Sequence, residues 1–376
     1  MDEQIHRGLE DITVANSRLS SIDGETGELL ISGFPVSELA PRASYEECVY
    51  LLLHDRLPTA SELATFRREL AERRPIPGEA EAVLERAAAE EASAMDALRM
   101  GAATASLGAN DGDPEADAIR AIAVFPTIVS TFWRYRQEME PISPDPDLGH
   151  TANLLYMLTG NRPDESTIRG LETYLNTVID HGLNASTFTA RVIVSSESDL
   201  LSAATGAIGT LKGPLHGGAP GPVLEMLQEV HETGAPAEYV RERLDAGERL
   251  IGFGHRVYRV RDPRATVLQS TPEDFYDERD DNGFFESAQA FEREAVDFLT
   301  EHKPELSLET NVEFYTAVLL HGVGIPRPLF SAMFAVSRVG GWMAHALEQL
   351  DDNRIIRPRG RYVGDNDRVW IELEER

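Results

Sequence analysis

Two histidines in glycine-rich turns are the residues of this chain best suited to chemistry. His216 lies in the motif GPLHGG at positions 213–218, and His255 lies in the motif GFGHRVY at positions 252–258. Glycine lets the backbone approach a ligand closely, and an imidazole can give or take a proton near neutral pH. Pro214 and the two following glycines leave no helical stripe in which His216 would be ordinary core packing. The pair therefore predicts acid/base chemistry.

The segment that follows His255 is basic, although the whole chain has a formal net charge of -29. It contains one acid, Asp262, and four arginines: Arg256, Arg259, Arg261 and Arg264. Guanidinium groups bind carboxylates and phosphates strongly. A local positive excess in so acidic a chain predicts a bound anion.

A carboxylate that could act as a base, Glu313, lies in the motif NVEFY at 311–315, just before an apolar helical stretch. Its aromatic neighbours would remove water from the carboxylate and strengthen it as a base. The alternative is that Glu313 is a first-turn acid favoured by the helix dipole. The local sequence leaves both possibilities open.

Arg338 lies on the apolar face of a long helix predicted over 330–350. An arginine in such surroundings needs a partner, which is usually a buried Asp or Glu but could be the carboxylate of a substrate. The tail at 353–361 then has no acid and four arginines: Arg354, Arg357, Arg359 and Arg361. Either a second anion site or a solvated basic surface would explain this tail.

The composition excludes several classes of protein. Cys48 is the sole cysteine among 376 residues, which excludes a disulfide framework and a thiolate metal cluster and fits a reducing compartment. The N-terminus starts acidic and lacks the apolar core of a secretory signal. The longest apolar stretch, 118–133, is interrupted by Arg120 and Pro126 and is expected to be too short to cross a bilayer. The acidity also disfavours nucleic acid and anionic membranes as partners.

The acidic excess predicts the environment in which the protein works. Asp and Glu number 64 against 35 Lys and Arg, and the only lysines are Lys212 and Lys303. Carboxylates hold water and counter-ions, whereas lysine stems add exposed apolar surface. We therefore expect a soluble, cytoplasmic protein adapted to concentrated salt.

Helical periodicity dominates the chain, which predicts an all-α protein. Apolar residues recur at spacings of three and four over 45–54, 165–183 and 198–211. A glycine-containing turn at 22–33 predicts one small hairpin. Two further segments are expected at the surface, namely a solvated Ala/Glu-rich helix at 78–98 and an acidic loop or frayed helix at 271–286.

The length favours about two domains, and Gly/Pro punctuation near 213–222 and 322–328 supplies plausible boundaries. Three familiar motifs are absent or incomplete. A dinucleotide fingerprint beginning at Gly252 fails because Val257 replaces its third glycine. The sequence also lacks an HExxH zinc motif and a GxSxG serine elbow. The chemistry must therefore come from His, Glu and Arg.

Taken in order, the motifs GPLHGG, GHRVY with DPR, NVEFY and IRPRGRYVG resemble those of citrate synthases, and the resemblance extends from residue 7 to residue 364. The length is similar to that of the shorter archaeal and Gram-positive form. The resemblance implies an almost entirely helical homodimer with a large dimerisation domain at 1–213 and 323–376. A small domain at 214–322 would close over the substrates. The implied activity is an acyl transfer that condenses acetyl-CoA with oxaloacetate and hydrolyses the thioester without a metal or redox cofactor.

The resemblance also implies roles for single residues. Glu313 would remove a methyl proton from the thioester, His216 would hydrogen-bond to the enolate oxygen, and His255 would protonate the oxaloacetate carbonyl. The oxaloacetate carboxylates would be bound by His181, Arg264, Arg338 and, from the other subunit, Arg357. The candidates for the CoA phosphates are Arg259, Lys212, Arg354 and Arg361.

The sequence departs from the family pattern at two positions near this chemistry. Glu313 replaces the usual aspartate, which changes its reach by about 1 Å, and Pro220 replaces an asparagine beside His216. Three functions stay open: a citrate synthase, a 2-methylcitrate synthase that uses propionyl-CoA, and a related protein that binds ligands without turnover. The presence of both histidines and of the family arginines argues against the third.

Overall fold

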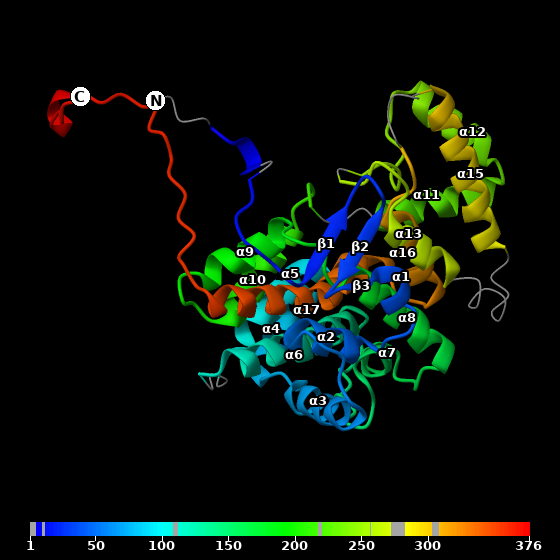
Figure 1. The fold of residues 1–376 in the computed structure, drawn as a ribbon, viewed down its shortest axis with the longest axis horizontal. Helices are drawn as coiled ribbons and strands as arrows, with labels where there is room; N and C mark the ends of the chain where they lie inside the picture. The colour runs from blue at the N-terminus through cyan, green and yellow to red at the C-terminus, as the bar shows by residue number, and fades with distance from the viewer. Residues whose placement is uncertain are drawn as a thin grey trace.

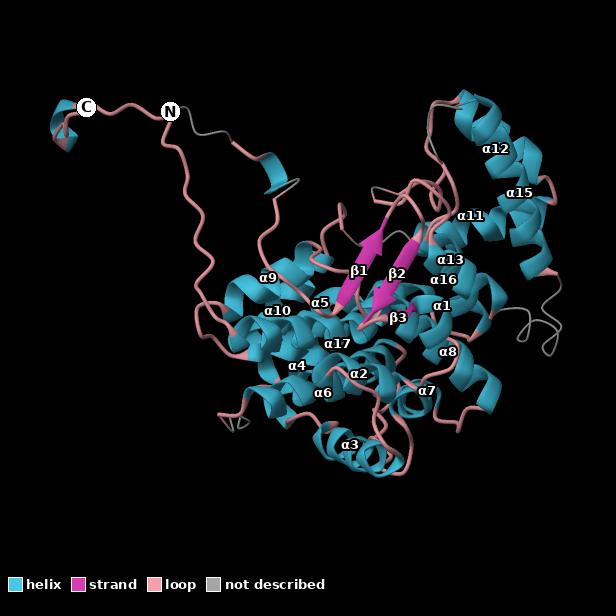
Figure 2. Cartoon of the chain, in the orientation of Figure 1, coloured by secondary structure: helices cyan, strands magenta, loops and turns pink. Residues whose placement is uncertain are grey.

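The computed structural model describes residues 5–9, 12–107, 112–216, 220–255, 257–271, 283–302 and 308–376. Within these ranges the regular secondary structure is helical apart from a small antiparallel sheet of order β1-β2-β3 and an isolated bridge (Figure 2). The all-α prediction is confirmed. The strands are β1 (Ser20–Asp23), β2 (Glu28–Ile31) and β3 (Phe34–Pro35). The hairpin lies where the sequence predicts it, whereas β3 was not expected.

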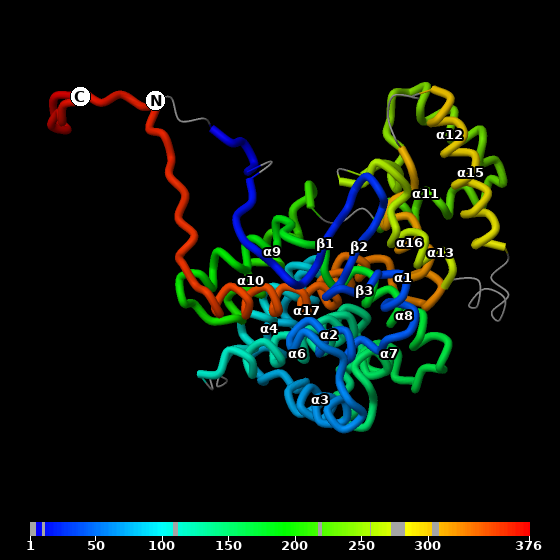
Figure 3. The backbone as a smooth tube through the Cα atoms, in the orientation of Figure 1, coloured from blue at the N-terminus to red at the C-terminus, as the bar shows by residue number. Residues whose placement is uncertain are grey.

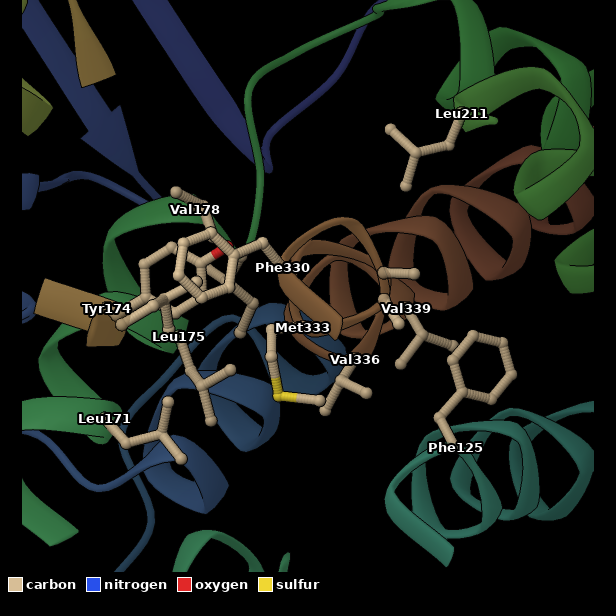
Figure 4. Packing of buried hydrophobic residues seen from close by; sticks show 14 of the residues in the cluster. Phe125, Leu171, Tyr174, Leu175, Val178, Leu211, Phe330, Met333, Val336 and Val339 are labelled. Carbon is tan, nitrogen blue, oxygen red and sulfur yellow. The ribbon is translucent and has the colours of Figure 1, made fainter. Parts of the chain in front are cut away.

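A first group of helices surrounds the long helix α17 (Phe330–Asp351), drawn in orange in Figure 1. Its members are α1 (Val36–Leu39), α2 (Tyr45–His54), α3 (Ala60–Arg73), α4 (Gly78–Ala89), α5 (Ala94–Thr104), α6 (Pro114–Arg136), α7 (His150–Thr159), α8 (Glu165–Val178), α9 (Ala185–Val194) and α10 (Leu200–Leu211). Figure 4 shows how α17 packs among these helices: Met333 lies beside Leu175 of α8, and Val339 lies beside Phe125 of α6.

A second group of helices packs together at the upper right of Figure 1. It consists of α11 (Pro220–Thr233), α12 (Pro236–Asp245), α13 (Pro263–Ser270), α15 (Phe284–His302) and α16 (Val312–Gly322). The division into a large and a small domain stays a prediction, as do the boundaries at 214 and 322.

The hairpin contacts two segments that carry candidate site residues. Its turn meets the 257–261 segment, where the backbone N–H of Arg259 donates to the carbonyl oxygen of Gly24 at 2.8 Å. A Cβ atom on Gly24 would lie 2.3 Å from the carbonyl oxygen of Val257, so glycine is required for this close approach. At the other end, Ser20 Oγ accepts a hydrogen bond from the backbone N–H of Gly182 at 2.8 Å. The small sheet thus fixes the positions of two loops, and it also contributes Leu29 and Ile31 to the core.

Three sequence expectations need correction. The segment 78–98 forms parts of two helices, α4 and α5, with buried faces, because small alanine side chains pack against α6. Helix α8 ends at Val178 instead of residue 183, and Gly182 adopts a left-handed conformation with φ 58° in the turn that follows.

The apolar stretch at 118–133 belongs to α6, which by length and composition could cross a membrane. However, 83% of the most apolar window of this helix is buried within the fold. Most of the acidic segment 271–286 lies outside the described residues.

After α17 the chain runs away from the body as an extended tail, shown in red at the left of Figure 3. Residues 354 to 376 of this tail are largely exposed, including apolar side chains such as Trp370 at 75% and Val363 at 88%. The four arginines at 354–361 therefore do not lie in the interior of the chain.

Candidate active site

Five segments that are distant in sequence place the candidate residues, and most of the helices involved have an Asn or Asp cap. His181 follows α8, and His216 follows α10. Arg264 lies at the start of α13, Glu313 at the start of α16, and Arg338 in the middle of α17. The N-cap residues of α9, α13 and α16 are Asn184, Asp262 and Asn311, each of which accepts a hydrogen bond from its own first turn.

His181 and His255 meet at the centre of the site. Their ring centroids are 5.8 Å apart, and the Tyr258 hydroxyl lies 3.1 Å from His181 Nε2. Burial, followed by the charges of Arg264 and Arg338, holds the pKa of His181 well below its usual range. The imidazole is therefore neutral and can hydrogen-bond to an anion without carrying charge.

The backbone determines which nitrogen of His255 carries the proton. Its Nδ1 accepts hydrogen bonds from the backbone N–H groups of Val257 at 3.0 Å and Tyr258 at 3.1 Å. The proton therefore lies on Nε2, which is 3.3 Å from Nη2 of Arg264. Since both atoms are donors, they converge on a position suited to a substrate oxygen. Burial and then Arg264 lower the pKa of His255 to about 4, so the side chain is a neutral proton donor.

His216 is oriented by Ser186 at the start of α9. Its Nε2 lies 2.8 Å from Ser186 Oγ and 3.3 Å from the backbone nitrogen of Ser186, which can only donate. Trp342 Nε1 donates to the same hydroxyl oxygen at 3.1 Å. These contacts leave the proton of His216 on Nδ1, and burial followed by Arg338 lowers the pKa of this histidine to about 4.

Glu313 is both a first-turn acid of α16 and a desolvated carboxylate, the two possibilities that the sequence left open. Its backbone N–H donates to the side chain of Asn311 at 3.0 Å, so it is a first-turn acid of α16. Its Oε2 is also buried, and no partner for it occurs within the described ranges. Burial, opposed by Arg264, raises the pKa of Glu313 to about 7. A carboxylate with this pKa can accept a proton at neutral pH.

The two buried arginines of the site, Arg264 and Arg338, have different sets of hydrogen-bond partners. Arg264 donates from Nε and Nη2 to Asp262 at 3.0 and 2.8 Å, and Asp262 also accepts from the backbone N–H of Val312 at 3.2 Å. Asp262 thereby connects Arg264 to the helix that carries Glu313.

Arg338, in contrast, has an incomplete set of partners. It donates from Nε to the carbonyl oxygen of Val178 at 2.6 Å, and its guanidinium lies 4.5 Å from the ring centroid of Phe334. Its Nη2 is buried without a partner among the described residues. Burial lowers the pKa of Arg338 to about 10, and the group stays charged at neutral pH. A buried cation with an unused donor suits an anionic ligand better than a structural ion pair.

The other predicted residues lie outside this cluster. Lys212 forms an ion pair with Asp96 at 2.5 Å, and the side chain of Arg259 is exposed. The remaining predicted residues lie on the exposed tail: Arg354, Arg357 and Arg361. Arg256 lies outside the described residues.

Sequence reasoning missed Tyr258, Ser186 and Trp342. Tyr258 could have been found, since it lies in the same motif as His255. Ser186 and Trp342 carry no local signal, because their relation to His216 arises only when α9 and α17 pack together.

Comparisons with known proteins find relatives along nearly the whole chain. The family model described as "Citrate synthase, C-terminal domain" matches residues 8–359. The chain is 42% identical to a citrate synthase of Haloferax volcanii over the full length of both chains. It is 36% identical to a 2-methylcitrate synthase of Mycobacterium tuberculosis, covering 97% of this chain and 92% of that relative.

Solved structures are similar along the whole chain as well. A citrate synthase from Pyrobaculum aerophilum gives a TM-score of 0.90 at 36% identity, covering 98% of this chain and 95% of that one. A citrate synthase from Thermoplasma acidophilum gives a TM-score of 0.89 at 29% identity over all of both chains, and its structure is a ternary complex with carboxymethyl-CoA and oxaloacetate.

Proposed function

The chain belongs to the citrate synthase family, and we propose that it condenses acetyl-CoA with oxaloacetate and water to give citrate and CoA. The observation that carries this proposal is a pair of buried atoms without a hydrogen-bond partner among the described residues, Glu313 Oε2 and Arg338 Nη2, in a site that also contains three neutral histidines. A buried carboxylate oxygen and a buried guanidinium nitrogen, neither with a hydrogen-bond partner among the described residues, together fit a reaction that removes a proton from one substrate and binds the carboxylates of another.

In the proposed first step, Glu313 takes a proton from the methyl group of acetyl-CoA. The negative charge moves to the thioester oxygen, which accepts a hydrogen bond from His216 Nδ1. The enolate carbon then attacks the keto carbon of oxaloacetate, and the carbonyl oxygen takes the proton of His255 Nε2. Water subsequently cleaves the thioester and releases CoA. The thioester is already the activated group, so the proposal includes no metal or redox cofactor.

The proposed oxaloacetate site uses His181, Arg264 and Arg338, supplemented by Arg357 of the partner subunit. Planar guanidinium groups can bind carboxylates through two parallel hydrogen bonds, which a lysine cannot do. The candidates for the CoA phosphates remain Arg259, Lys212, Arg354 and Arg361. Closure of the small domain over the large one would bring His216, His255 and Glu313 onto oxaloacetate bound by His181 and Arg338 of the large domain.

The direct test of this function is the release of free CoA, followed with a thiol reagent in molar KCl. Acetyl-CoA and propionyl-CoA are each supplied with and without oxaloacetate. We expect release that depends on oxaloacetate and is faster with acetyl-CoA. Oxaloacetate binding without CoA release from either thioester would support the non-catalytic alternative.

The second candidate function is that of a 2-methylcitrate synthase, favoured by the 36% identical relative with that name. The two acyl groups differ by one methylene, which changes binding by only about 1 to 3 kcal/mol. A higher kcat/KM with propionyl-CoA would establish this alternative and leave the roles of the histidines unchanged.

The pH dependence of turnover should follow Glu313. The carboxylate must be ionised to accept a proton, and its pKa is raised to about 7, so we expect kcat/KM to fall about tenfold per unit below pH 7. The site histidines His216 and His255, whose pKa values lie near 4, add no limb between pH 5 and 7. Initial rates between pH 4 and 9 measure this profile. An acidic limb centred near pH 4.5 would show that Glu313 is solvated in the working enzyme.

We further propose a homodimer in which the extended tail places Arg357 in the site of the other subunit. Mixing the inactive variants His255→Ala and Arg357→Ala and reassociating them should restore about one quarter of the native sites, since half of the random dimers are mixed and each has one intact site. Activity is measured before and after reassociation. A mixture that stays as inactive as its components would place Arg357 in the site of its own chain or outside the mechanism.

The acidic composition supports a cytoplasmic, archaeal-type enzyme adapted to concentrated salt, and the Haloferax relative comes from a halophilic archaeon. We expect the melting temperature to rise by roughly 10 °C or more between about 0.1 and 2 M KCl, because salt screens repulsion among the carboxylates. Circular dichroism measures it, and sucrose at equal osmolality is the uncharged control. A melting temperature indifferent to KCl would contradict this adaptation.

A further inference from the structure

A series of buried polar side chains begins directly beside His181. Asp180 is completely buried, and its Oδ2 lies 3.3 Å from Nε2 of His345 on α17. Nδ1 of the same imidazole lies 3.0 Å from Nη1 of Arg191 on α9. A guanidinium can only donate, so His345 accepts at Nδ1 and donates from Nε2 to Asp180. His345 is therefore a neutral bridge with a fixed tautomer.

The series continues from Arg191 to the start of the C-terminal tail. Arg191 donates from Nε to Gln349 Oε1 at 3.2 Å, and Gln349 Nε2 donates to Asn353 Oδ1 at 3.3 Å. Asn353 in turn donates to the carbonyl oxygen of Ser195 at 3.2 Å. Ser195 Oγ accepts from the backbone N–H of Ile356 at 3.0 Å. Ile356, which this hydrogen bond anchors, is the neighbour of Arg357.

Close packing couples the His181 turn to α17. A Cβ atom on Gly341 would lie 2.4 Å from the carbonyl oxygen of Ile179 and 2.8 Å from Asp180 Oδ1. The backbone of α17 therefore touches the turn itself. A displacement of the helix at this point must move Asp180, and with it the residue that follows.

Several charged groups surround this series. Burial disfavours ionisation of Asp180, but His345, Ser20 and Arg338 outweigh it and hold the pKa of the carboxyl below its usual value. Arg191 is paired with Glu348 at 2.8 Å, and Glu348 also accepts from the backbone N–H of Arg18. Well-packed apolar residues would serve a purely structural role at least as well as buried ions. The buried polar groups therefore point to a requirement for defined positions.

We propose that His345 is a positioning residue for oxaloacetate, acting through Asp180 on His181, and that Arg191 and Gln349 join it to the anchor of the tail that carries Arg357. One set of hydrogen bonds thereby fixes His181 in the site of its own subunit. The same set fixes the C-terminal tail, which carries Arg357 to the site of the partner subunit. The assignment of oxaloacetate to His181 rests on the proposed function, whereas the link to the tail does not.

The first arm of the test compares three variants on α17. His345→Leu removes both hydrogen bonds, His345→Gln keeps a donor near the position of Nε2, and Met343→Leu is the control for a change at a buried position of the same helix. We expect His345→Leu to raise the KM for oxaloacetate about tenfold with the KM for acyl-CoA changed less than twofold, and His345→Gln to recover most of the loss. An unchanged KM for oxaloacetate in His345→Leu overturns the positioning role.

The second arm needs no activity. Trypsin cleavage after Arg354 reports how firmly the tail is anchored, and mass spectrometry follows it over time. We expect faster cleavage in His345→Leu and in Gln349→Leu than in Met343→Leu, with circular dichroism confirming that all are folded. If His345→Leu fails to fold, the cleavage rate of Gln349→Leu alone tests whether these hydrogen bonds anchor the tail. Equal cleavage rates in Gln349→Leu and Met343→Leu overturn the link, whether or not the native protein releases CoA.

Discussion

Glu313→Gln is expected to abolish condensation while oxaloacetate binding changes little. The amide has the size of the carboxylate but cannot accept a proton, and loss of a general base typically lowers turnover by about 10² to 10⁴. The unpartnered, buried Oε2 and the raised pKa of Glu313 explain why this side chain is the strongest base of the site near neutral pH. CoA release measures turnover, and quenching of tryptophan fluorescence measures oxaloacetate binding.

Glu313→Asp is the matched control, because it keeps the charge and shortens the side chain by about 1 Å. We expect it to lose rate as well, since the carboxylate falls back from the methyl group. An Asp variant faster than the native protein would show that the site has kept the spacing of a shorter base. A Gln variant that turns over at the native rate would remove Glu313 from the mechanism.

The candidate site residues could be singled out from the sequence because their local sequences are unusual. Glycines beside His216 and His255, and aromatic residues beside Glu313, are features that core packing alone does not require. The desolvation expected for Glu313 agrees with its raised pKa. Helix positions followed from apolar periodicity, as α2 and α10 illustrate.

The partners of these residues could not be predicted, because they depend on how helices pack. Nothing near Arg338 in the sequence indicates that Val178 supplies its acceptor or that Nη2 stays without a partner. The Ser186 contact of His216 likewise joins residues thirty positions apart. The segment 78–98 was mistaken for one solvated helix because alanine suits both a buried and an exposed helical face.

The second large effect is expected at His255. His255→Ala removes the donor that protonates the keto oxygen, and turnover should fall by roughly a hundredfold or more with the helical fold intact. His302→Ala, which changes an exposed histidine at the end of α15, is the control and should retain native turnover. CoA release at saturating oxaloacetate measures both variants.

A third variant separates the polarisation of the carbonyl from proton transfer to it. His255→Gln can place an N–H near the position of Nε2, so it should bind oxaloacetate with a KM within a few fold of the native value. It cannot give up that proton readily, so kcat should stay close to that of the alanine variant. Recovery of kcat in the glutamine variant would mean that His255 only polarises the carbonyl, and another donor would then have to supply the proton. The hydrogen bonds from Val257 and Tyr258 to Nδ1 argue against that outcome, since they hold the proton of a neutral imidazole on the nitrogen that lies beside Arg264.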